Sequence, residues 1–289
     1  MRRTLCALIL LAAQSSSLCA ATFYLGVLHG DEEVFKYEIS VVRLALDYAS
    51  GDHTLELVPM VDTSQDRVFR LMESEESEVN VFFSGYSPER EARFLQVDIP
   101  LTRGLLGYRL LVSREDRLAE FAHIQTLKDL QSYSIGSGIG WPDNDYLEAN
   151  GLEVIASQYA NLWRMLQRNR FDLFHRGIQE VFEELRRPEA EGLAVVPGIV
   201  LAFRFDYFIY VNARRQDLHD ILEEGLQRAF DSGALTRNFN GSPRIKEALR
   251  DSHLDQRTVI PLQLPQAYRS LDEIPAKYWY TPAAIQEEK

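Results

Sequence analysis

The residues whose types and spacing most suggest chemistry lie at 136–145, in the run "GSGIGWPDND". Glycines such as Gly138 allow positive φ and let a ligand approach the main chain closely. Pro142 suits the first turn of a helix, whose unpaired N–H groups carry partial positive charge. Trp141 could close over a planar or apolar part of a ligand, or could equally pack in a core. The run therefore predicts a strand-to-helix turn at a binding site. Its candidate ligand contacts are Ser137, Gly138 and Trp141.

Other kinds of reactive centre find little support in the sequence. The six histidines are scattered without paired spacing, so no metal site is expected. No "GxSxG" run occurs, and no Gly-Lys-Ser/Thr follows the glycines, so neither a nucleophile elbow nor a phosphate-binding loop is predicted. The sequence gives no catalytic motif and implies no cofactor.

The first residues, "MRRTLCALILLAAQSSSLCAATF", have the layout of a secretory signal peptide. A membrane anchor fits less well, because the apolar run at 5–13 is too short to span a bilayer. We therefore expect residues 1–20 to be a signal peptide, with cleavage after Ala20 or Ala21, and a periplasmic location. Cys6 and Cys19 lie in that segment, so the mature chain would have no thiol. The formal net charge of −12 argues against nucleic acid and anionic lipid surfaces as partners.

The chain that follows alternates predicted strands and helices. "TFYLGVL" has the composition of a strand, and residues 31–50 have apolar positions at helical spacing. The alternation restarts after a crossing segment near 100–108. This pattern predicts an α/β fold of two lobes, each a mostly parallel sheet flanked by helices, with a cleft between them. The expected lobes are 22–104 with 206–289, and 105–205. The tail 256–289 is expected as extended chain on the surface of the first lobe.

Four stretches, in this order, resemble the type 2 periplasmic solute-binding proteins of the amino-acid-binding branch (family 3). They are "SGYSPEREARFLQVDIPLTRGLLGYRLLV", "TLKDLQSYSIGSGIG", "YANLWRMLQRNRFDLF" and "QDLHDILEEGLQRAFDSGALTRNF". The Gly-Trp-Pro-Asp run and "RFDLFHRG" are similar to a poorly characterised subgroup of that branch. The resemblance covers nearly all of the chain after the expected signal peptide. It implies a monomer that closes on a small solute and works with a membrane transporter or a sensor.

The resemblance also implies site residues. Arg90 in "SPER" matches the arginine that clamps the ligand carboxylate in the family, a role suited to its planar fork. Its alternative is a surface ion pair with a neighbouring glutamate. Tyr86 and Ser87 lie on the same loop and could supply further contacts. Where the family has an aspartate for the ligand ammonium, this sequence has His175 and Arg176 instead.

This last departure changes the expected solute. An arginine at that place repels an ammonium and attracts a second anionic group, so we expect an anionic or carboxylate-bearing solute. His29 stands at the end of the first strand, where a pocket role and a core role are equally open. If His175 protonates in the cleft, binding would change near neutral pH.

Two other functions remain open at the level of sequence. Dehydratases that act on prephenate-like acids resemble the same family, and such chemistry needs an acid with a raised pKa in the cleft. Asp145, Glu180 and His175 are the candidates for that role, although none lies in a motif. A closed module that contacts a partner through its C-terminal tail is the other alternative.

Overall fold

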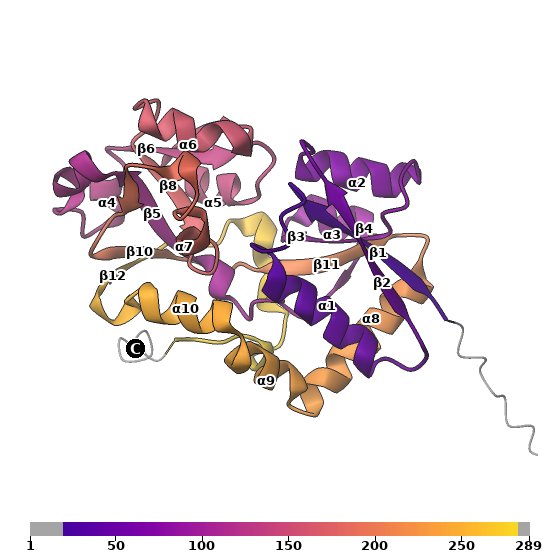
Figure 1. Ribbon diagram of the computed structural model, residues 1–289. Coiled ribbons are helices and arrows are strands. Elements are labelled where there is room, and N and C mark those ends of the chain that lie inside the picture. The colour runs from indigo at the N-terminus through magenta and orange to yellow at the C-terminus, as the bar shows by residue number, and fades with distance from the viewer. Residues whose placement is uncertain (1–19, 283–289) are drawn as a thin grey trace, which may run out of the picture.

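The computed structural model describes residues 20–282 and shows two lobes side by side (Figure 1). The expected signal peptide lies, apart from Ala20, outside the described residues. The two α/β lobes confirm the predicted fold class. No helix in the described part of the chain is long and apolar enough to cross a membrane.

The first lobe is built on a five-stranded sheet in the order β2-β1-β3-β11-β4. Its strands are β1 (Thr22–Leu28), β2 (Thr54–Met60), β3 (Val81–Gly85), β4 (Phe94–Val97) and β11 (Tyr207–Asn212). Its helices are α1 (Lys36–Tyr48), α2 (Gln65–Ser74), α3 (Pro88–Arg93), α8 (Gln216–Asp231) and α9 (Ala234–Gly241). Local sequence explains these elements: α1 buries an apolar stripe that includes Val42, and the Ser64 hydroxyl accepts a hydrogen bond from the backbone N–H of Arg67 to begin α2.

The second lobe has a sheet in the order β12-β10-β5-β8-β6-β7, with β9 paired to β5. Its strands are β5 (Tyr108–Arg114), β6 (Ser134–Gly138), β7 (Glu153–Ser157), β8 (Leu173–Gly177), β9 (Leu193–Val195), β10 (Ile199–Ala202) and β12 (Thr258–Pro261). Its helices are α4 (Leu127–Leu130), α5 (Asp143–Ala149), α6 (Tyr159–Gln167) and α7 (Val181–Glu184), and α10 (Pro243–Asp251) follows α9. Both sheets are mixed rather than mostly parallel, because β5 and β11, the strands that follow the crossings, run antiparallel to their neighbours.

One buried carboxylate ties together two of the segments that cross between the lobes. Asp206 accepts hydrogen bonds from the backbone N–H (3.0 Å) and hydroxyl (2.9 Å) of Thr102, and also from the backbone N–H of Gly104. Burial raises the pKa of Asp206 to about 7, although these donors favour its ionised form. The crossing near 100–108 is therefore pinned to the return crossing before β11.

The C-terminal tail corrects the expected lobe boundaries. Strand β12 pairs in parallel with β10, so this part of the tail belongs to the second lobe's sheet. A four-residue strand with a distant partner leaves too little periodicity for the sequence to reveal it.

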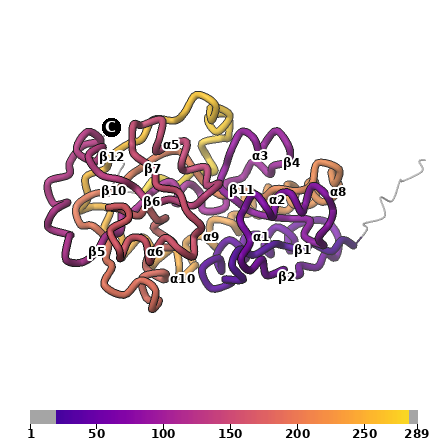
Figure 2. Tube along the Cα trace, turned by 90° about the horizontal axis from the view of Figure 1, so that it is seen from above, coloured from indigo at the N-terminus to yellow at the C-terminus, as the bar shows by residue number. Residues whose placement is uncertain are grey.

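Beyond β12, the tail contacts both lobes. The Tyr268 hydroxyl donates to Asp145 on α5 (2.6 Å), while Ser270 pairs with the hydroxyl of Tyr86 in the first lobe. Further on, the Tyr280 N–H donates to the carbonyl of Arg103 (2.7 Å). Figure 2 shows this yellow segment running along the second lobe and turning between the lobes. We call residues 258–280 the C-terminal strap.

Candidate functional site

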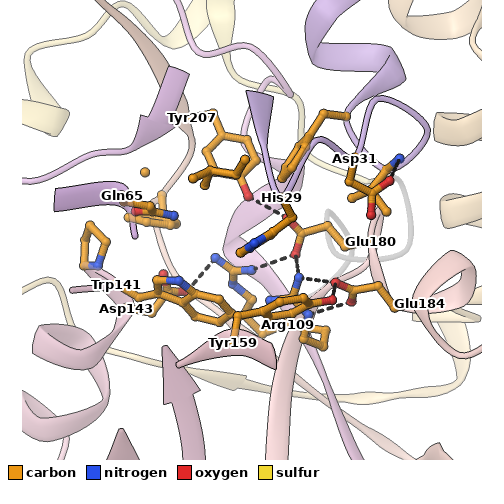
Figure 3. A pocket seen from close by; sticks show the side chains of 17 residues that line it. His29, Asp31, Gln65, Arg109, Trp141, Asp143, Tyr159, Glu180, Glu184 and Tyr207 are labelled. Carbon is orange, nitrogen blue, oxygen red and sulfur yellow. Dashed lines mark hydrogen bonds and ion pairs between the residues drawn. The ribbon is translucent and has the colours of Figure 1, made fainter. Parts of the chain in front are cut away.

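The cleft between the lobes holds two adjoining cavities. The inner cavity, of about 40 Å³, is drawn in Figure 3, and the outer one measures about 190 Å³. Leu28, His29 and Gln65 of the first lobe and Trp141 and Tyr159 of the second line both. The inner cavity has room for a few water molecules, whereas the outer one exceeds the roughly 150 Å³ that admits a benzene-sized molecule.

The inner cavity is lined by a network of buried charges. Arg176 makes two 2.6 Å hydrogen bonds to Glu184 and a 2.9 Å ion pair with Glu180. Arg109 lies 2.5 Å from Asp143 and 3.6 Å from Glu180. All five side chains are at most 6% exposed. The described network thus offers two cations and three carboxylates.

Burial and pairing compete in setting the pKa values of this network. Burial alone lowers the pKa of Arg176, but Glu180 and Glu184 hold it well above its usual value. Burial raises the pKa of Glu180, yet the two arginines bring it below the usual value. For Asp143 burial outweighs the attraction of Arg109, and the pKa is raised.

Three aromatic rings pack around the Arg176 guanidinium. Its Cζ lies 5.0 Å from the ring centroid of Trp141, 5.6 Å from that of Tyr159 and 5.4 Å from that of Phe174. At the mouth, the His29 ring stacks on Tyr159 at 4.8 Å. His29 and Trp141 therefore line the cleft, which decides between the cleft and core positions that the sequence left open for each.

Arg90 lies elsewhere. It lines neither cleft cavity, and its guanidinium is already bonded by the protein. Nη1 donates to the Ser84 hydroxyl (2.9 Å) and the Gly85 carbonyl (2.7 Å), and Nη2 donates to Gln65 (3.0 Å) and to the Gly140 carbonyl (2.9 Å). Because Gly140 belongs to the other lobe, Arg90 acts in this structure as a bridge across the closed cleft. The carboxylate clamp stays a prediction that would require Arg90 to give up these partners.

The neighbours of Arg90 on its loop also have structural partners. Ser87 accepts a hydrogen bond from the backbone N–H of Arg90 at the start of α3. The Tyr86 hydroxyl donates to Glu91 (2.6 Å), on the side of the C-terminal strap. Neither residue lines the cleft cavities as the structure describes them.

His175 and Ser137 form a buried pair beneath the cleft. His175 Nε2 lies 2.9 Å from the Ser137 hydroxyl, and both residues are fully buried. Burial lowers the pKa of His175 well below its usual value, and the positive charges of Arg109 and Arg176 lower it further. This burial and the lowered pKa argue against the pH-dependent binding that protonation of His175 would cause near neutrality.

The glycines of the 136–145 run serve close packing. A Cβ on Gly138 would lie 2.2 Å from the Trp141 ring, so only glycine leaves room for the indole there. Gly140 has φ +75°, and a Cβ on it would lie 2.4 Å from Asp66 of the facing lobe. The run thus places Trp141 and allows the lobes to approach, while Gly138 itself lines the outer cavity.

Several residues of the site were not singled out from the sequence as binding residues. They are Gln65, Asp143, Tyr159, Glu184 and Tyr207. Glu180 and Glu184, four and eight residues after Arg176, offered a signal of charge pairing. Tyr207 and Tyr159 offered none, since their hydroxyls reach Glu180 (2.5 Å) and Glu184 (2.7 Å) only through the tertiary fold.

No family model and no curated protein matches the sequence. Solved structures do resemble the fold. An amino acid ABC transporter substrate-binding protein from Streptococcus pneumoniae bound to L-arginine is 17% identical with a TM-score of 0.57, covering 78% of this chain and 95% of that one. An ancestral arginine-binding protein bound to arginine is 14% identical with a TM-score of 0.57, covering 76% and 97%. A histidine kinase sensor domain with similarity to periplasmic binding proteins is 15% identical with a TM-score of 0.58, covering 76% and 95%. At this identity the likeness shows the fold, and the chain has the two-lobed architecture of amino acid ABC transporter substrate-binding proteins.

Proposed function

We propose that this chain is an extracytoplasmic binding protein, not an enzyme, that holds a small solute in its interlobe cleft for transport or sensing. The observation that carries the proposal is the outer cavity, because both lobes line it and closure would enclose a solute there. The neighbours support both outcomes, since their descriptions name transporter substrate-binding proteins and a sensor domain. A periplasmic location, a monomeric state and a membrane transporter or sensor as partner belong to the same proposal.

The charges in the cleft bear on the class of solute. From the sequence, Arg90 and Arg176 predict an anionic or carboxylate-bearing solute. Both arginines are bonded by protein groups, and carboxylates outnumber guanidinium groups in the inner network. The outer cavity adds Asp62, hydroxyls and amides but no lysine or arginine. This balance favours a neutral or cationic solute over an anion.

The alternatives have narrower support. A dehydratase needs a free acid facing its substrate, whereas the carboxylates of the inner cavity are paired with arginines. One observation favours the module that stays closed and contacts a partner: side chains leave the inner cavity a volume of only about 40 Å³.

A thermal-shift screen tests the proposal. The chain is refolded to strip any bound solute and is tested against organic acids, amino acids, polyamines, nucleobases and oligopeptides. A solute at a hundred times its dissociation constant adds about 2.7 kcal/mol, or roughly 5–11 °C in Tm for a protein of this size.

A pair of variants tests whether the solute binds in the cleft. His29→Asn removes the ring that lines both cavities, and Asn tolerates the positive φ of this position. His123→Asn changes an exposed histidine outside the cleft and serves as the control. The proposal expects a shift with one solute class that is weakened only in His29→Asn. The absence of a Tm shift with every solute class would refute the proposal in favour of the partner-contacting module. Conversion of a solute to a product would favour the enzyme instead.

A further inference from the structure

We propose that the cleft contains a complete recognition subsite for a guanidinium group and that the chain's own Arg176 fills it. The proposal concerns the cleft to which the proposed function assigns the solute and deepens it by naming the chemistry of the inner subsite. Its basis is the set of groups arranged around one side chain.

The acceptors match the shape of a guanidinium. Nε and Nη2 of Arg176 donate in parallel to the two oxygens of Glu184, each at 2.6 Å, and Nη2 also reaches Glu180 at 2.9 Å. Two parallel N–H···O bonds are the geometry that distinguishes a planar fork from an ammonium. The acceptors are themselves held in place: Tyr159 donates to Glu184 and Tyr207 donates to Glu180.

The faces of the cation are recognised as well. Trp141, Tyr159 and Phe174 place their ring centroids 5.0–5.6 Å from its central carbon. Such rings attract a cation through their electron-rich faces, most strongly where water is excluded. Arg176 is only 5% exposed, so this environment is desolvated.

Position distinguishes this arginine from others with similar partners. Arg117 also forms a two-bond pair with a glutamate (2.9 and 2.8 Å), bonds a second carboxylate at 2.9 Å and lies over Phe121 at 5.2 Å. Its side chain, however, is 20% exposed and lines none of the cavities described. Arg176 lines the inner cavity, which meets the outer cavity at Trp141 and Tyr159.

A consequence for solute selection follows. A solute that carries a guanidinium or amidinium group can enter the inner subsite only by displacing Arg176 from Glu184 and Glu180. A solute without such a group binds in the outer cavity and leaves Arg176 in place. Arg176 is thus a specificity-determining residue that keeps the inner subsite satisfied when no solute is present.

Chemical rescue tests the inference. Arg176→Ala removes the side chain and leaves Glu184, Glu180 and the rings around an enclosed hole. Methylguanidinium chloride, at 1–50 mM, is the probe. Methylammonium chloride and sodium chloride at equal ionic strength control for charge and salt. Arg117→Ala is the matched control variant, because it removes a similarly paired arginine at a place where solvent can fill the gap.

The expected result is a Tm well below that of the unaltered chain for Arg176→Ala, restored saturably by methylguanidinium. At ten times its dissociation constant the probe raises Tm by roughly 3–6 °C. Methylammonium gives less than half of that rise, and the unaltered chain and Arg117→Ala show no rise beyond the salt control. A folded Arg176→Ala variant that does not respond, or that responds equally to methylammonium, would overturn the proposal.

A second measurement covers the case in which Arg176→Ala does not fold alone. The variant is refolded from urea with and without the probe, and the folded fraction is measured by size exclusion and circular dichroism. The subsite is supported if the folded fraction rises at least twofold with methylguanidinium and with neither of the other two salts. Equal folded fractions in all three salts refute it. Rescue of the variant by methylguanidinium, together with no Tm shift in the solute screen of the unaltered chain, would refute the proposed function alone. The reverse pattern would refute this inference alone.

Discussion

The hydrogen bond from Tyr207 to Glu180 joins the two lobes inside the cleft, and removing it should loosen their closure. Tyr207 lies on β11 of the first lobe, and its hydroxyl donates to Glu180 of the second at 2.5 Å. A hydrogen bond to a charged group contributes about 1.5–3 kcal/mol. Because Tyr207 is partly exposed, we take about 1.5–2 kcal/mol for Tyr207→Phe. That energy multiplies the ratio of open to closed molecules by about 10 to 30.

The opening can be measured between spin labels at Arg70→Cys on α2 and Arg164→Cys on α6, both exposed. Cys6 and Cys19, which lie outside the described residues, are replaced by serine so that only these two sites react. In Tyr207→Phe we expect a longer-distance population and a Tm lower by roughly 3–8 °C. Tyr210→Phe is the control, since the buried Tyr210 hydroxyl on the same strand has no hydrogen-bond partner in the described structure. Identical distances and stabilities in the two variants would refute the idea that this bond holds the lobes together.

Three further perturbations test the buried carboxyl on α1, the strap and the glycine run. Burial raises the pKa of Glu38 to about 8, so the folded chain keeps a proton that the unfolded chain loses near 4.5. The free energy of unfolding should therefore fall by up to about 1.4 kcal/mol per pH unit between those values. In urea titrations at pH 5, 6.5 and 8 Glu38→Gln should flatten this fall, and an unchanged slope would contradict the assignment. Tyr268→Phe removes the strap's 2.6 Å bond to Asp145 on α5. Because Asp145 is exposed to solvent, urea unfolding should show a loss of only about 0.5–1.5 kcal/mol, and no loss would mean that the strap does not brace the second lobe. Gly140 and Gly198 both have positive φ, so replacing either with alanine should destabilise the fold by about 1–2 kcal/mol. Only the Cβ added at position 140 would meet Asp66 across the cleft, so only Gly140→Ala should lengthen the distance between the spin labels.

The sequence predicted the architecture because the relevant signals are local. The alternation of strands and helices depends on residues within a few positions of one another. The strap escaped prediction, since the pairing of β12 with β10 joins residues 59 positions apart, such as Ile199 and Thr258. Its 3₁₀ turns at 266–272 and 276–278 carry too little periodicity to be recognised.

In the candidate site, too, local signals were predictable from the sequence and long-range contacts were not. Residue type and position brought His29, Trp141 and Arg176 into consideration, and the structure places all three at the cleft. The sequence alone predicts an Arg176 that is free to bind an anion, because local residues do not show which carboxylates are buried beside it.

By itself, then, the sequence determined two α/β lobes with a cleft, and it placed an indole and an arginine at the ends of second-lobe strands. Only the tertiary structure decided what those groups face. In the cleft, Glu184 and Tyr159 contact Arg176. Arg90 instead donates its hydrogen bonds to groups of the first lobe and to Gly140 of the second. The physical reason is that secondary structure follows from local periodicity, whereas the partner of a buried charge depends on which distant side chains share its desolvated space.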